Sequence, residues 1–155
     1  MSIHFFQERV SFTLPCPELF SRWLTKFVKG ENRTIDHINY IFCSDNYLLK
    51  INQTHLQHDT FTDVITFNYG TAEAPLLADI YISIPRIREN STKFKATFWK
   101  ELARVMAHGI LHVLGYKDRI AADKTKMRAK EDYALSLPEI KFLTSLSFIS
   151  QPQNF

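Results

Sequence analysis

Cysteine and glycine are both scarce in this chain of 155 residues. Its two cysteines, Cys16 and Cys43, form no CxxC pair and are too few for a disulfide framework, so we expect two reduced thiols. Four glycines and six prolines are also too few for a low-complexity or disordered chain. Because 45% of the residues are hydrophobic, the chain can build its own core, and we interpret residues 1–155 as one domain.

Long hydrophobic runs are absent as well. No apolar stretch approaches the roughly 20 residues that a membrane-spanning helix requires, so no membrane association is expected. Polar residues from Gln7 onward interrupt the apolar start of the chain, which argues against a secretory signal and favours a cytoplasmic protein. The formal charge of +3 permits an anionic partner without requiring one.

The spacing of apolar residues predicts both strands and helices. Strands are predicted at Ile3–Phe6, Val10–Leu14, Asp36–Cys43, Asp63–Phe67 and Leu76–Ile84. Helices are predicted from Pro17 to about Gly30, from Asp45 to about His55, from Ala96 to Leu114 and from Ala121 to Leu135. The remaining predictions are a loop at Leu56–Thr60, a short basic turn after Pro85, a short element at Pro138–Phe148 and a frayed end at Gln151–Phe155. This succession predicts an α+β fold, in which helices pack on one mixed sheet whose strand order stays open.

The most informative stretch runs from His108 to Asp118, with the sequence HGILHVLGYKD. Residues four apart on a helix lie about 40° apart around its axis, so the imidazoles of His108 and His112 can converge on one ion. Gly115 follows where the helix must end, because glycine adopts the left-handed conformation without steric cost. Asp118 can then bring a carboxylate to a third position. The pattern predicts a metal site on a central helix and the loop that follows it.

Three protein ligands leave a fourth position open, as in catalytic zinc sites. We therefore predict one zinc ion, or another divalent metal, held by His108, His112 and Asp118. Metal-bound water is the proposed nucleophile, and no catalytic side chain is identified. A carboxylate in place of a third imidazole should make the ion a weaker acid. An HxxxH pair alone is more often two ordinary histidines; the glycine and the carboxylate at these spacings favour the metal site.

The metzincin protease pattern HExxHxxGxxH is the nearest comparison from spacing alone. In that pattern the residue after the first histidine is the glutamate that serves as general base. Here Gly109 occupies this position, so peptide hydrolysis by that mechanism is disfavoured.

The motif resembles that of the YbeY family, H-G-x-L-H-L-x-G-Y-D-H, in which three histidines bind the metal. A second family block, similar to L-N-x-x-Y-R-x-x-D-x-P-T-D-V-L-S-F, corresponds to Ile51–Phe67, and a third, G-D-I-x-I, corresponds to Ala78–Ile82. The chain departs from the family at two positions. Asp118 stands in place of the third histidine, and Leu56 stands in place of an arginine thought to face the substrate. Either a nearby cation such as Lys117, Arg104 or Arg119 substitutes for that arginine, or activity is reduced.

The resemblance implies a cytoplasmic endoribonuclease directed at single strands, acting in small-subunit rRNA maturation and ribosome quality control. Its partners would be RNA and the ribosome or its small subunit, and DNA is not expected. The predicted substrate-binding residues are Arg86, Arg88, Arg104 and Lys117. The first three belong to a basic run, with Lys93, Lys95 and Lys100, that leads into the metal helix and could follow a phosphate backbone. An ordinary solvated helix face is an equal alternative for this run.

A second function stays open at this stage. The chain could be a ribosome-assembly factor that binds RNA, with a structural metal and little cleavage activity, and Leu56 favours this alternative. Cleavage assays with metal added and removed separate the two functions.

Overall fold

The computed structural model describes residues 2–56 and 62–145. Its elements, in chain order, are β1 (Ser2–Glu8), α1 (Pro17–Gly30), β2 (Ile35–Cys43), α2 (Asp45–His55), β3 (Val64–Asn68), β4 (Leu76–Ser83), α3 (Ile84–Lys93), α4 (Phe98–Val113), α5 (Ala121–Ser136) and α6 (Pro138–Ser145). Within the described ranges, no helix is both long enough and apolar enough to span a bilayer.

The four strands form one mixed sheet in the order β1-β2-β4-β3. β2 lies parallel to both β1 and β4, whereas β3 runs antiparallel to β4 and forms one edge of the sheet. The expected α+β class with a mixed sheet is confirmed. Alternate residues of β4, such as Ala78, Ile80 and Ile82, are buried in the main core, so this strand presents one face to the helical layer.

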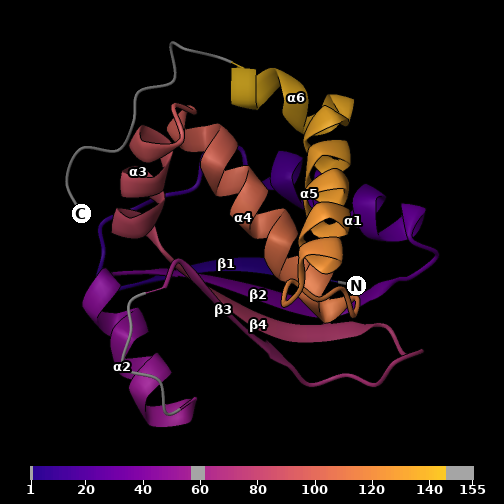
Figure 1. Ribbon diagram of the computed structural model, residues 1–155, viewed down its shortest axis with the longest axis horizontal. Helices are drawn as coiled ribbons and strands as arrows, with labels where there is room; N and C mark the ends of the chain where they lie inside the picture. The colour runs from indigo at the N-terminus through magenta and orange to yellow at the C-terminus, as the bar shows by residue number, and fades with distance from the viewer. Residues whose placement is uncertain (1, 57–61, 146–155) are drawn as a thin grey trace.

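Helices cover one face of the sheet, and α4 runs through the middle of this layer (Figure 1). α4 contacts β3, β4, α3, α5 and α6, and most of its residues are buried. Two buried side chains form hydrogen bonds between elements. The Tyr40 hydroxyl of β2 donates to the carbonyl of Met106 in α4, and the Trp23 indole N–H of α1 donates to the carbonyl of Ala134 in α5. α2 packs separately, against a small second core that contains Leu48 and Ile65 (Figure 1).

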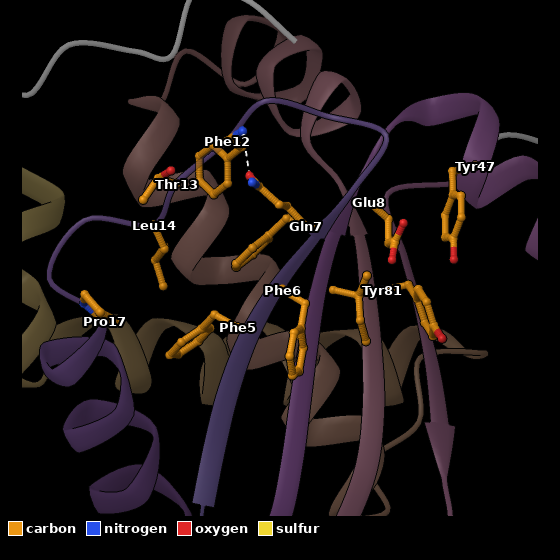
Figure 2. A pocket seen from close by; sticks show the side chains of 12 residues that line it. Phe5, Phe6, Gln7, Glu8, Phe12, Thr13, Leu14, Pro17, Tyr47 and Tyr81 are labelled. Carbon is orange, nitrogen blue, oxygen red and sulfur yellow. Dashed lines mark hydrogen bonds between the residues drawn. The ribbon is translucent and has the colours of Figure 1, made fainter.

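The strand predicted at Val10–Leu14 is wrong. β1 extends to Glu8, the chain turns at Arg9 with φ 60°, and residues 10–14 form no strand. Figure 2 shows the local hydrogen bond that replaces sheet pairing, in which the Phe12 N–H donates to Gln7 Oε1 over 3.0 Å. Because β1 and β2 are parallel, this segment must return the chain to the start of α1, and its apolar Phe12 and Leu14 fill the core instead.

The basic turn expected after Pro85 is a ten-residue helix, α3. Proline is tolerated in the first turn of a helix, where its missing N–H would have no partner. Ser83 caps this turn, since its hydroxyl accepts a hydrogen bond from the Arg86 N–H. The other predicted helices form close to their expected bounds, and α6 fills most of the element expected at 138–148. Most of the predicted loop at 56–60 and the end at 151–155 lie outside the described residues.

Candidate metal centre

His108 and His112 lie one turn apart on the last half of α4. Their ring centroids are 4.5 Å apart with the planes at 84°, and the two Nε2 atoms approach to 3.0 Å. Both side chains are half-buried. The helix thus brings two imidazole nitrogens together at one point, as the four-residue spacing predicts.

The loop after α4 returns a carboxylate to these rings. Gly115 has a φ of +104°, and the N–H groups of Gly115 and Tyr116 donate to the carbonyls of His112 and Leu111. This turn ends the helix and reverses the chain, as the glycine predicts. Asp118 Oδ2 then lies 3.4 Å from the Nε2 atom of each histidine. The three predicted residues therefore meet, with their ligand atoms all within 4.8 Å of one another.

The far nitrogen of each imidazole is held by a separate partner. His108 Nδ1 lies 2.7 Å from Glu131 Oε2 of α5, and His112 Nδ1 lies 3.1 Å from the carbonyl oxygen of Tyr116. Because a carbonyl and an ionised carboxylate only accept hydrogen bonds, each Nδ1 carries the proton. Both Nε2 lone pairs then face the cluster with Asp118, which is the tautomer that binding of a cation requires.

Glu131 is itself fixed in place. It is 6% exposed, and its second oxygen accepts from Arg104 over 3.1 Å, while Arg104 also contacts Asp132 at 3.0 Å. Burial lowers the pKa of His108, but the hydrogen bond and charge of Glu131, with the charges of Asp118 and Asp63, outweigh it and raise that pKa. The surrounding carboxylates thus favour a positive charge at Nε2, where a bound cation would take the place of a proton.

Two hollows adjoin the cluster, one on each side of His108. The first has a volume of about 620 Å³ and lies beside β3 and the end of α2; Leu56 and His112 are among its lining residues. The second has a volume of about 890 Å³ and lies between the α3–α4 connection and α5; Phe94 and Arg104 are among its lining residues. His108, Asp118 and Asp63 border both. The separate cavity in Figure 2, at the end of β1, shares no lining residue with either hollow.

The four predicted substrate-binding cations lie in different places. Arg104 lines the second hollow, where it is paired with Glu131 and Asp132. Arg86 forms an ion pair with Asp45 at 2.7 Å and lines neither hollow. Arg88 and Lys117 also line neither, although Lys117 is exposed directly beside Asp118 in the sequence. The structure brings only Arg104 to the cluster.

Sequence spacing gives Glu131 no place at the site, and Asp63, in the second family block, is expected only to cap or hydrogen-bond near it. Glu131 follows His108 by 23 residues and meets it only because α5 packs on α4. Asp63 comes directly before β3, where Asn90 of α3 donates to it over 3.3 Å. Burial raises the pKa of Asp63, against the lowering effects of His108 and of nearby backbone N–H groups. No local spacing identifies either residue; the general expectation that a ligating histidine has an outer carboxylate partner is the one available signal.

The close packing of α4 on the sheet explains why a glycine, and not a glutamate, follows His108. A Cβ atom on Gly109 would lie 2.8 Å from Ile80 Cγ2 and 3.2 Å from Ile80 Cδ1. This position of α4 therefore faces the sheet in close contact and has no space for a side chain.

A mixed sheet carrying a helix with two convergent histidines and a returning carboxylate defines an α+β protein with a candidate hydrolytic metal centre. A family model described as Endoribonuclease YbeY matches residues 2–137, and the chain belongs to this family. The chain is 48% identical over 136 residues to the Endoribonuclease YbeY of Flavobacterium psychrophilum, covering 88% of this chain and 96% of that protein. It is 45% identical over 130 residues to that of Amoebophilus asiaticus, covering 84% and 88%.

A solved structure is also similar. The solution structure of TM1509 from Thermotoga maritima superposes with a TM-score of 0.67 and 27% identity, and the match covers 97% of this chain and 98% of that one. The fold of the whole described chain therefore agrees with that of a solved protein.

Proposed function

We propose that this chain is a metal-dependent endoribonuclease that cuts single-stranded RNA in the maturation of small-subunit rRNA and in ribosome quality control. The observation that carries this proposal is the convergence of His108 Nε2, His112 Nε2 and Asp118 Oδ2 in a family of named endoribonucleases. The proposed setting is the cytoplasm, with the ribosome or its small subunit as partner and the whole chain acting as one domain.

The distances among the three ligand atoms fit a small divalent ion. Two ligand atoms that each lie about 2.0–2.1 Å from a tetrahedral zinc ion are about 3.3 Å from each other. The observed separations are 3.0, 3.4 and 3.4 Å. Two nitrogens and one carboxylate oxygen suit zinc, and the same set also suits iron(II). We propose zinc as the ion, held by His108, His112 and Asp118.

When bound, such an ion polarises a phosphoryl oxygen and lowers the pKa of water at the site. Residues of the chain orient the two histidine ligands for this chemistry. Glu131 and the Tyr116 carbonyl fix the tautomer and orientation of the two imidazoles. The hollows on both sides of His108 leave room for a strand that crosses the cluster. Phosphodiester hydrolysis is the reaction that this arrangement supports.

Replacement of one ligand tests the proposal. His112→Ala should lose both the bound metal and the cleavage of single-stranded RNA, because two of three ligands cannot hold the ion with the same affinity. Metal content and a gel-based cleavage assay measure the two effects. His4→Ala, which removes an exposed histidine of β1, is the matched control and should retain both. Cleavage by pure His112→Ala protein at the parent rate would refute the proposed site.

The non-cleaving assembly factor is the alternative. The name that the relatives share favours the enzyme. RNA binding that is equal with and without metal, with no cuts in either state, would favour the alternative instead.

A further inference from the structure

The two hollows beside the cluster differ in the number of cations that line them. The first, which contains Leu56, has no lysine or arginine among its lining residues, within the described ranges 2–56 and 62–145. The second is lined by five: Lys95, Lys100, Arg104, Lys124 and Arg128. Among the described lining residues, lysines and arginines beside His108 therefore lie on the α4–α5 side.

The lysines of the second hollow are available to a ligand. Lys95, Lys100 and Lys124 are exposed, and none forms an ion pair within the part of the chain that the structure describes. They come from three places, the α3–α4 connection, the first turn of α4 and the first turn of α5. Their convergence on one hollow depends on the fold and is not the periodic pattern of a single solvated helix face.

Five carboxylates line the same hollow: Asp63, Glu101, Asp118, Glu131 and Asp132. Arg104 contacts both Glu131 and Asp132. Glu101 is 5% exposed, and burial raises its pKa to about 7, so its carboxyl is partly protonated at neutral pH. Asp63 and Asp118 interact with His108 at the inner end of the hollow, so the positive charge that no ion pair compensates lies at the three exposed lysines.

An exposed aromatic ring stands at the same place. Phe94 is 56% exposed, although a phenylalanine usually lies in the core. Its position is well defined: its N–H donates to the Asn90 carbonyl at the end of α3, Lys95 follows with φ 55°, and the Ala96 N–H bonds back to Ser91. This hydrogen-bonded turn places the ring beside the lysines of the hollow, and Lys93 Nζ lies 5.7 Å from the ring centroid. Aromatic rings next to cations are the common means of binding single-stranded nucleic acid, through base stacking and phosphate contact.

We propose that the second hollow seats a single-stranded RNA segment, with a base stacked on Phe94 and phosphates contacted by Lys95, Lys100 and Lys124. The strand then passes to the phosphodiester next to His108 and Asp118. This subsite supplies the positive charge that is missing on the side of Leu56. The inference rests on the proposed function, since it concerns the same RNA substrate.

Binding of RNA to charge-matched variants tests the subsite. The probe is a short, fluorescently labelled single-stranded RNA with phosphorothioate linkages that resist cleavage, and the metal-loaded full chain is titrated by anisotropy at several salt concentrations. The triple variant Lys95→Ala, Lys100→Ala, Lys124→Ala should raise Kd at least about tenfold at low salt. It should also reduce the slope of log K against log salt by about 2, at about 0.7 for each phosphate contact. The triple variant Lys29→Ala, Lys50→Ala, Lys141→Ala removes the same charge from exposed sites elsewhere and should bind nearly as the parent.

Substitutions of Phe94 test the proposed base stacking. Phe94→Leu should raise Kd at least about fivefold, whereas Phe94→Trp should bind as well as the parent. Phe142→Leu, at an exposed aromatic on α6, is the control.

Cleavage of the same sequence with ordinary linkages separates this inference from the proposed function. If the parent binds through these residues but never cuts, the subsite stands and the endoribonuclease proposal fails. If the parent cuts while the Lys95, Lys100 and Lys124 variant binds with unchanged Kd and salt slope, the subsite is refuted. It is equally refuted if the parent does not bind the probe.

Discussion

Leu56 is the C-cap of α2 and borders the first hollow, so the position that the motif comparison aligns with a family arginine lies beside the candidate metal centre. Its side chain is 41% exposed and can contribute no charge to that hollow. Leu56→Arg should restore a cationic contact there and lower the Kd for single-stranded RNA about fivefold, as one good charge-assisted phosphate contact would. Anisotropy against salt concentration measures this change. Leu56→Gln, of similar length but neutral, is the control; equal gains from both variants would show that charge is not the cause.

Glu131 is the outer partner of His108 and should act as a positioning residue. Glu131→Gln keeps the shape of the side chain but weakens the hold on His108 Nδ1 and on Arg104. We expect metal affinity to fall roughly 10- to 100-fold, the usual effect of losing such a partner. Competition with a chromogenic chelator measures the affinity. Asp132 is the other carboxylate that contacts Arg104, and it is exposed. Asp132→Asn should leave the metal affinity nearly unchanged. An unaltered affinity in Glu131→Gln would refute the positioning role.

The residues of the site divide into those that sequence spacing predicts and those that it cannot. His108 and His112 follow from helical periodicity, and Asp118 follows from the turn that Gly115 permits, because all three interactions are local. Glu131 and Asp63 belong to other elements and meet the cluster only through tertiary packing, which no local spacing encodes.

At the level of the element, the close packing of α4 on the sheet depends on the missing side chain of Gly109. Gly109→Ala should destabilise the protein by about 1–3 kcal/mol, because the added Cβ would lie 2.8 Å from Ile80 on a well-packed strand. Urea unfolding measures the change. Gly30→Ala at the end of α1, where nothing lies within 4 Å, should instead be neutral or stabilising by up to about 1 kcal/mol. Equal effects at the two glycines would mean that the contact with Ile80 does not limit the approach of α4 to the sheet.

α4 also carries a carboxyl whose burial makes stability depend on pH. Burial raises the pKa of Glu101 from 4.5 to about 7, with Arg104 opposing and Asp63 adding to the shift. The folded state therefore holds this proton more tightly than the unfolded state, and stability falls as pH rises from about 4.5 to 7. Glu101→Gln should remove this loss and gain about 3 kcal/mol over the parent at pH above 7, with little difference below 4.5.

Urea unfolding of parent and variant at several pH values provides the measurement. Because other groups titrate in both proteins, the difference between the two curves is the quantity to follow. Glu73→Gln, at an exposed site, is the matched control. A flat difference for Glu101→Gln would mean that the buried carboxyl makes no net contribution to the pH dependence.

Among the elements, those with clear periodicity and caps were predictable and those that depend on context were not. The helices at 45–55 and 98–113 have N-caps in Ser44 and Thr97, whose hydroxyls accept from the third residue of the helix. Residues 10–14 alternate as a strand would, but no neighbouring strand is available to pair with them at the end of β1. Pro85 predicts only a short basic turn, whereas Ser83 before it caps the helix α3.

At the scale of the whole molecule, the order of the strands in the sheet could not be predicted from the sequence. Several strands have similar aliphatic patterns, and nothing local shows that β4 enters between β2 and β3. This order matters for the site, because α4 packs on β3 and β4 and thereby brings Asp63, at the start of β3, beside His108. The two hollows on either side of His108 are likewise a product of the assembled layers.

Because the three candidate ligands join α4 to the loop that precedes α5, metal binding should stabilise the whole fold. An ion that binds only the folded state at 100 times its Kd adds about 2.7 kcal/mol, which corresponds to a rise in Tm of about 5–10 °C for a protein of this size. Thermal unfolding with zinc and with chelator measures the rise. His112→Ala should show almost no rise, whereas His4→Ala should show the full one. A rise of equal size in His112→Ala would place the ion elsewhere, since binding at the three-residue cluster cannot survive the loss of one of its two imidazoles unchanged.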